Sequence, residues 1–206
     1  MNRSGEFETI LTGVRKLRTT KTKLRESKKM KGTNTTKFIV HAGVIAAIYV
    51  VLTYVSALLN LAYGEVQFRI SEALMVLPVF TPAAIPGLTI GCVIANLSSP
   101  FGWVDIVCGS FATLLATIFA YLVRNVRFKK LPVLAPLGAV IFNAVIVGAE
   151  IAFFMPEGFT WAAFLAAALS VGLGELVVCY VLGLPLAAWL ESSGFKAMNK
   201  RLLGNS

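Results

Sequence analysis

The sequence predicts an all-α membrane protein, a six-helix transmembrane bundle with its N- and C-termini in the cytoplasm. The first observation is composition: 57% of the 206 residues are hydrophobic and 14% are charged, whereas about one quarter of a soluble domain is charged. The second is five apolar blocks, each near or above the roughly 20 residues that a helix needs to cross a bilayer. The third is a pair of prolines that divide one block into two helices.

The basic residues are concentrated at the N-terminus. The net charge is +9, yet eleven of the nineteen Lys and Arg lie in residues 1–37 and none falls between Arg69 and Arg124. This distribution is typical of charge that sets topology beside a bilayer, because cytoplasmic loops of membrane proteins carry the excess of Lys and Arg. We therefore expect a multi-pass protein of the cell membrane, in contact with lipid and not with nucleic acid.

Three regions follow from this pattern. Residues 1–37 are predicted to be a basic, disordered cytoplasmic tail, 38–191 the six-helix membrane domain, and 192–206 a basic cytoplasmic C-terminal tail. Met30 precedes the first apolar block by seven residues, so translation from Met30 is an alternative that would leave out residues 1–29.

The apolar blocks have to be reconciled with the basic clusters. The N-terminal tail and the basic loop 124–130 are both expected in the cytoplasm, which requires an even number of crossings between them. Three blocks lie between, so one of them must contain an extra helix. The blocks span residues 38–61, 73–97, 103–123, 131–155 and 160–190.

The second block contains the break. Pro82 and Pro86 interrupt it, and proline both removes an amide donor and clashes with the preceding helical turn. We predict two shorter helices, over 72–80 and 84–97, and hence six helices in all.

The last block has the opposite difficulty. Its 31 residues would extend about 46 Å as a helix, longer than a bilayer core. Tilt, a bend near Gly172 and Gly174, or a stop at Pro185 would each accommodate the excess.

Polar side chains converge at one depth of this bundle. Ionisable groups inside membrane segments are costly and usually face a cavity or a partner. Most of these residues fall in the outer half, beside a loop whose alternating residues 66–71 predict an extended lid, and we expect Asn143 and Glu150 to face that loop. The predicted substrate-binding residues are Gln67, Arg69, Glu72, Asn96, Asp105, Asn143, Glu150 and Glu175.

Each of these residues also has a structural explanation. Glu72 suits a helix N-terminus, Asp105 the membrane interface, and Asn143 a bridge between helices. Arg69 is able to pair with Glu65 or Glu72. Their convergence is therefore more informative than any one of them.

No catalytic or metal-binding pattern is present. HExxH, GxSxG and the phosphate-binding GxxxxGK[ST] are all missing from the sequence. Cys92, Cys108 and Cys179 lie inside apolar blocks, and the single histidine, His41, cannot make a metal site alone. We expect no enzyme activity, no cofactor and no metal, and ATP-driven transport would need a partner ATPase.

Small residues recur at four-residue spacing in the first block. Ala42 and Ala46 form one such pair, and Gly43 and Ala47 another. A stripe of small residues lets a second helix approach closely, so this face serves either docking of a partner or packing inside the bundle.

Three longer stretches carry a resemblance to a known family. They are VQFRISEAL at 66–74, TPAAIPGLTIGCVIANL at 81–97 and GWVDIVCGSFATLLA at 102–116. Residues 38–191 resemble the QueT family, the substrate-binding S components of energy-coupling factor (ECF) transporters assigned to queuosine precursors. The resemblance implies a six-helix bundle that captures its substrate from outside and docks on a transmembrane coupling subunit with two cytosolic ATPases. Ala42 and Ala46 match the Ala-x-x-x-Ala docking pattern of such subunits.

The implied cargo, a 7-deazaguanine, suits the predicted residues. Its N–H donors and the ammonium of its aminomethyl form match carboxylates, and its carbonyl matches Gln or Arg. Tyr63, Phe68 and Trp103 are candidate ring contacts, with interfacial anchoring as the alternative. Another vitamin-like cargo, an intramembrane enzyme and a purely structural membrane subunit stay open.

Overall fold

The computed structural model describes residues 35–61, 68–99, 101–156 and 158–192. The chain divides into two units, Met1–Val40 and His41–Ser206. In the first unit, residues 35–40 are helical, so the first helix includes residues assigned to the predicted tail. The rest of that tail and residues 193–206 lie outside the described residues.

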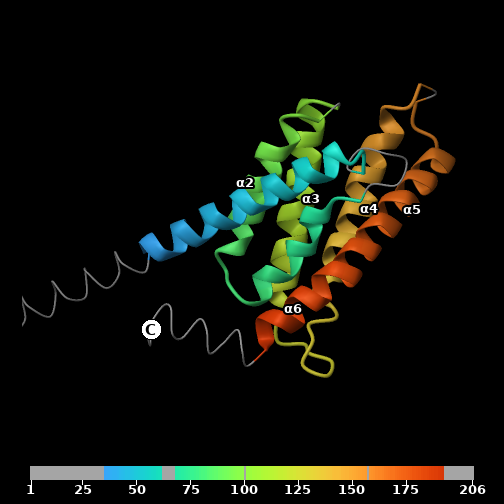
Figure 1. Cartoon of the computed structure of the whole chain (residues 1–206). Coiled ribbons are helices and arrows are strands. Elements are labelled where there is room, and N and C mark those ends of the chain that lie inside the picture. The colour runs from blue at the N-terminus through green and yellow to red at the C-terminus, as the bar shows by residue number, and fades with distance from the viewer. Residues whose placement is uncertain (1–34, 62–67, 100, 157, 193–206) are drawn as a thin grey trace, which may run out of the picture. The chain divides into compact units, whose positions relative to one another are not determined.

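The described residues form helices and no strand, apart from one isolated bridge between Phe128 and Leu131. Four helices are long and apolar enough to cross a membrane, and two more are shorter. The predicted all-helical membrane bundle is therefore confirmed (Figure 1). The elements are a first helix at Thr35–Leu58, η1 at Ile70–Val79, α2 at Ala84–Asn96, α3 at Trp103–Leu122, α4 at Ala135–Phe153, α5 at Trp161–Val177, η2 at Val178–Gly183 and α6 at Leu184–Glu191.

The second apolar block is broken, as its prolines predict. Its first half, η1, is a 3₁₀ helix that ends at Val79, and α2 begins at Ala84. One detail differs from the prediction. η1 begins at Ile70, so the predicted extended lid is wrong for Ile70 and Ser71. Pro78 lies inside η1, within the range predicted to be helical. A 3₁₀ helix is the tighter form, and the chain leaves it only at the turn that contains Pro82.

The last apolar block is one continuous helix, Trp161–Glu191. It does not stop at Pro185, because the π-helical turn η2 comes immediately before α6. The π turn lies directly before Pro185, whose missing amide would otherwise interrupt the α-helical ladder there.

Small residues pack the first helix against α2. A Cβ atom added to Gly87 would lie 2.8 Å from the Ala42 carbonyl oxygen, and one added to Gly91 would lie 2.9 Å from the Cβ of Tyr49. Ala42 and Ala46 are both buried. In this chain they therefore serve the internal packing that was the alternative to docking, and their docking role stays a prediction.

The neighbouring pair on the same helix is turned outward. Gly43 and Ala47 are exposed, and a Cβ at Gly43 would have no atom within 4 Å. The first helix thus carries one buried and one exposed stripe of small residues.

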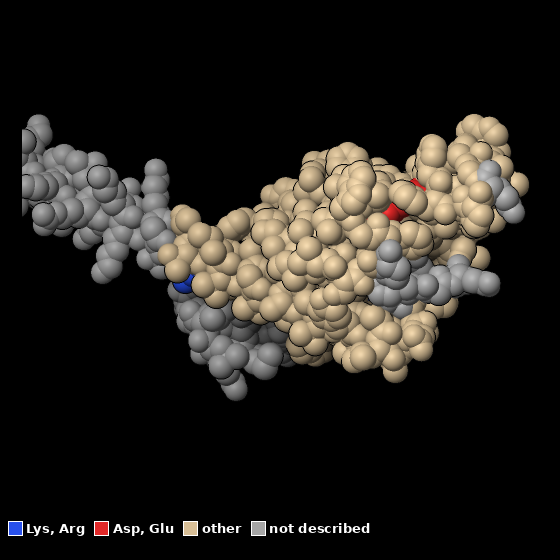
Figure 2. Space-filling model, turned by 90° about the horizontal axis from the view of Figure 1, so that it is seen from above, with Lys and Arg blue, Asp and Glu red and all other residues tan. Residues whose placement is uncertain are grey.

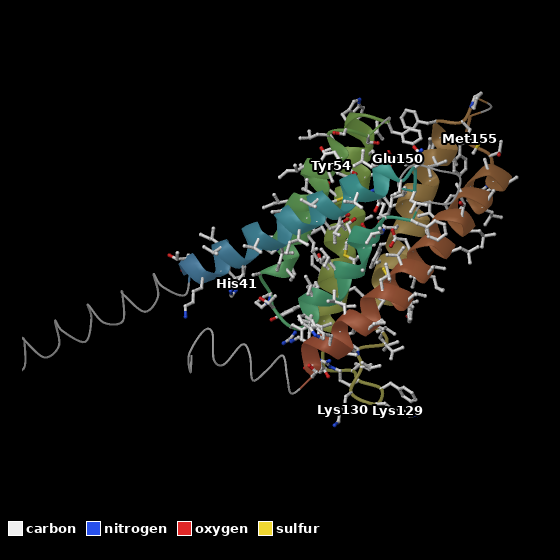
Figure 3. The ribbon with its side chains drawn as sticks, viewed as in Figure 1. His41, Tyr54, Lys129, Lys130, Glu150 and Met155 are labelled. Atoms are coloured by element: carbon white, nitrogen blue, oxygen red, sulfur yellow. The ribbon has the colours of Figure 1, made fainter. Side chains whose placement is uncertain are left out.

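The two ends of the bundle differ in charge. Arg127, in the basic loop between α3 and α4, forms an ion pair with Glu191 at the end of α6. Figure 3 places Lys129 and Lys130 at this end and Glu150 and Met155 at the other. The positive-inside rule predicts that the basic end faces the cytoplasm, and we call the opposite one the outer end.

Candidate functional site

A cluster of buried polar side chains occupies the interior between η1 and helices α2 to α5. In the described part of the chain, one cationic and four acidic residues are buried, each at most 7% exposed as a whole residue. Two buried asparagines accompany them. The group consists of Arg69, Glu72, Asn96, Asp105, Asn143, Glu150 and Glu175.

Arg69 connects two helix ends. Its Nη1 donates to Asn96 Oδ1 at 3.4 Å, and its Nη2 lies 3.4 Å from Asp105 Oδ2. Asn96 is the last residue of α2 and donates from Nδ2 to the backbone oxygen of Asp105, in the first turn of α3, at 2.9 Å. A Cβ on Gly109 would lie 2.6 Å from Asn96 Nδ2, so any other residue at this position would displace the Asn96 amide from its present place. We call Arg69, Asn96 and Asp105 the Arg69 cluster.

Glu72 lies one helical turn after Arg69 and makes a different contact. The Tyr49 hydroxyl donates to Glu72 Oε1, and Tyr49 is fully buried. Glu72 Oε2 is buried and has no hydrogen-bond partner among the described residues. One of its two carboxylate oxygens is thus available as an acceptor.

Two hydroxyl groups of the first helix fix the start of η1. Thr53 Oγ1 donates to Ser71 Oγ at 2.8 Å, and Ser56 Oγ accepts from the backbone N–H of Ile70 at 2.9 Å. η1 has no side-chain N-cap of its own. The bond from Ile70 to Ser56 therefore satisfies a backbone N–H at its start that has no partner within the helix. Together the two bonds hold the segment that carries Arg69 and Glu72.

Asn143 and Glu175 form a bridge between α4 and α5. Asn143 Nδ2 donates to Glu175 Oε1 at 2.9 Å. Cys179 Sγ, one turn further along the last helix, lies 3.6 Å from Glu175 Oε2 and 3.4 Å from the Glu72 backbone oxygen. Glu175 Oε1 therefore accepts from Asn143, while the single thiol hydrogen of Cys179 is shared between Glu175 Oε2 and the Glu72 backbone oxygen.

Glu150, near the end of α4, is the exception. It is only 5% exposed, and within the described ranges neither carboxylate oxygen has a hydrogen-bond partner. The charges of Asp105 and Arg69 both act on it. Viewed from above, the molecule shows a small group of acidic atoms surrounded by uncharged residues (Figure 2).

The cluster has more negative than positive groups. Four carboxylates surround one guanidinium, whose charge acts on all of them. Burying an ionised carboxylate without full compensation is costly. Such a site is suited to a ligand that brings N–H donors or positive charge.

The sequence predicted most of these residues but not their pairing. Arg69 contacts Asn96 and Asp105, and Asn143 contacts Glu175. That Asn143 and Glu150 face the loop before η1 stays a prediction. The alternative pairing of Arg69 with Glu72 is not the ion pair that forms.

Other predicted residues are distributed differently. Gln67, Tyr63 and Glu65 lie outside the described residues. Phe68 is partly buried. Trp103 is 75% exposed, an arrangement that fits interfacial anchoring.

Two residues of the site were missed. Tyr49 follows Ala42 and Ala46 at helical spacing, so the buried stripe of the first helix already indicated that it points inward. Cys179 follows Glu175 by one turn, which placed it on the same helix face. Among the described residues there is no group of three side chains that could hold a metal ion.

The six apolar helices found in the described ranges, with their buried polar cluster, define a multi-pass protein of the cell membrane. A protein-family model described as "QueT transporter" matches residues 39–192, and the chain belongs to that family. This membership in a family of transporters supports the prediction that the protein is not an enzyme.

A curated relative and the solved structures complete the comparison. The chain is 40% identical over 92 residues to the "Queuosine precursor transporter QueT" of Lactococcus lactis subsp. cremoris (strain MG1363). The match covers 45% of this chain and 53% of the relative, so the chain spans about half the length of that protein. No solved structure matches the chain significantly.

Proposed function

We propose that the protein is the substrate-capture subunit of an ATP-driven ECF importer and binds a queuosine precursor of the 7-deazaguanine type from the outer side of the membrane. Family membership and the name of the Lactococcus relative support this assignment. The observation that carries it is the buried cluster of four carboxylates around Arg69. A structural bridge between helices would need fewer carboxylates than this.

The chemistry of a deazaguanine complements this cluster. Its pairing edge presents adjacent N–H donors, which a carboxylate accepts two at a time, and a carbonyl beside them, which an amide or guanidinium donor satisfies. Glu72 Oε2 is an available acceptor, and the Arg69 cluster supplies donors. The proposed binding residues are Gln67, Arg69, Glu72, Asn96, Asp105, Asn143, Glu150 and Glu175.

Access to the site is proposed from the outer end. The Arg69 cluster joins the end of α2 to the start of α3, and Arg69 itself precedes η1. Separation of Arg69 from Asn96 and Asp105 would free Asp105 and the Asn96 amide for contacts with a ligand. Ligand groups would then replace these internal contacts.

Energy would come from partners. The sequence has no phosphate-binding loop of the GxxxxGK[ST] type, so the proposal includes a transmembrane coupling subunit and two cytosolic ATPases. Ala42 and Ala46 are the proposed docking residues. Since both are buried against α2, docking through them would require the first helix to move, whereas Gly43 and Ala47 are exposed already.

The test is ligand binding by the full-length protein in detergent. Mass spectrometry of co-purified small molecules should detect a deazaguanine, and calorimetric titration with 7-aminomethyl-7-deazaguanine should give a micromolar or lower Kd. Asp105→Asn should weaken binding, and Glu191→Gln, at the opposite end, should not. If a different vitamin-like molecule co-purifies and no deazaguanine binds, the substrate assignment is wrong. If no ligand binds at all, the protein is better described as a structural subunit.

A further inference from the structure

We infer that Glu150 is the counter-ion for a positively charged substituent of the ligand, so that the site selects a cationic deazaguanine over a neutral one of the same size. The inference rests on the proposed function and assigns one residue of that site a specific role.

Glu150 differs from the other buried carboxylates in its hydrogen bonding. Its two oxygens are buried and have no hydrogen-bond partner among the described residues. Each of the other three accepts at least one side-chain donor in the structure. The donors are Arg69 to Asp105, Tyr49 to Glu72, and Asn143 to Glu175.

The position of Glu150 suits a ligand that enters from the outer end. It lies one turn before Phe153, the last residue of α4, and Figure 3 shows it at the end opposite Lys129 and Lys130. Helix α3 packs along α4, and the loop between them lies at the basic end, so Asp105 in the first turn of α3 and Glu150 near the end of α4 both lie at the outer end. A ligand held by the Arg69 cluster would bring a short substituent within reach of Glu150.

The charge balance favours a cation over a neutral donor. An ammonium has three N–H donors and no acceptor, and its hydrogen bonds to a carboxylate are about twice as strong as neutral ones. It would also offset the excess of carboxylates over the single arginine. A hydroxymethyl group of the same size has one donor and leaves the negative charge uncompensated.

The experiment compares two ligands and two variants by calorimetry at neutral pH. Wild-type protein should bind 7-aminomethyl-7-deazaguanine at least about tenfold more tightly than 7-hydroxymethyl-7-deazaguanine, because a charge-assisted bond replaces a neutral one. Glu150→Gln should remove most of this preference by weakening binding of the amine, while affinity for the alcohol changes little. Glu191→Gln, a matched substitution at the other end of the bundle, should keep the wild-type ratio.

The outcomes separate this inference from the proposed function. If the wild-type protein binds both ligands equally, or Glu150→Gln keeps the preference, the role of Glu150 is overturned while the substrate class stands. If the wild-type protein binds neither, the proposed function fails. Glu150→Asp keeps the negative charge and should keep the preference for the amine. If a folded Glu150→Asp variant loses that preference, the role of Glu150 is also contradicted, whether or not Glu150→Gln folds.

Discussion

Among the residues that the structure describes, two arginine–carboxylate pairs lie at opposite ends of the bundle, and they differ in burial. Arg69 and Asp105 approach to 3.4 Å with side chains 8% and 3% exposed, whereas Arg127 and Glu191 are 29% and 21% exposed. Exposed pairs contribute about 0–1 kcal/mol, whereas breaking a buried pair by removing one partner costs about 3–5 kcal/mol. The buried pair of Arg69 and Asp105 is therefore important for the structure, whereas the pair of Arg127 and Glu191 is a surface contact of the basic loop.

The desolvation cost of the buried pair indicates a role other than stabilising the fold. A buried ion pair is often no more stabilising than apolar residues of the same volume. Retaining Arg69 among four carboxylates is understandable if the site has to recognise a polar ligand, since intramembrane ionisable residues typically mark substrate pathways.

The largest effect is expected when the buried cation, Arg69, is removed. Arg69→Met should destabilise the protein by about 3–5 kcal/mol, because Asp105 is left buried without its partner. Chemical denaturation in detergent measures this loss. The double variant Arg69→Met with Asp105→Leu should recover much of the stability and none of the ligand binding; recovery of binding would contradict a role for the pair in the site.

Removing one neutral donor should have a smaller effect. Tyr49→Phe deletes the hydroxyl that donates to Glu72 Oε1 and should cost about 1.5–3 kcal/mol, the range for a hydrogen bond to a charged group. The same denaturation measurement applies. An unchanged stability would mean that Glu72 finds another donor.

The two small-residue stripes of the first helix extend the contrast between buried and exposed positions. Ala46→Leu should cost about 1–3 kcal/mol through overpacking against Gly91, whereas Ala47→Leu, on the exposed face, should stay within about 0.5 kcal/mol of wild type. Stability and uptake by the assembled transporter are measured together. If only Ala47→Leu impairs uptake, with the stability of the protein unchanged, the partner docks on the exposed stripe of Gly43 and Ala47. If Ala46→Leu impairs uptake without loss of stability, the partner docks on the predicted stripe of Ala42 and Ala46.

The smallest effect is expected at the exposed ion pair. Glu191→Gln should change stability by about 0–1 kcal/mol, and this difference should shrink further at high salt because exposed charges are screened. Denaturation at low and high ionic strength measures both. A loss as large as that of Arg69→Met would remove the distinction between the two pairs.

Much of the fold was predictable because its signals are local. Hydropathy predicted the long helices, and Pro82 predicted the break between η1 and α2. Asn96 and Asp105 were placed at the same end of the bundle because one ends a helix and the other begins the next. The 3₁₀ form of η1 and the π turn before Pro185 were not predictable, since they depend on how a helix adjusts to its neighbours.

The sequence by itself determined that this is a helical membrane protein with an unusual number of carboxylates in its interior. Composition, proline position and charge distribution are properties of the chain that no packing can alter. Only the tertiary structure decided which groups meet: Arg69 with Asp105, Tyr49 with Glu72, and Asn143 with Glu175. These partners are separated by 36, 23 and 32 residues. Their contact depends on the rotation and depth of each helix, which are set by side-chain packing across the whole bundle.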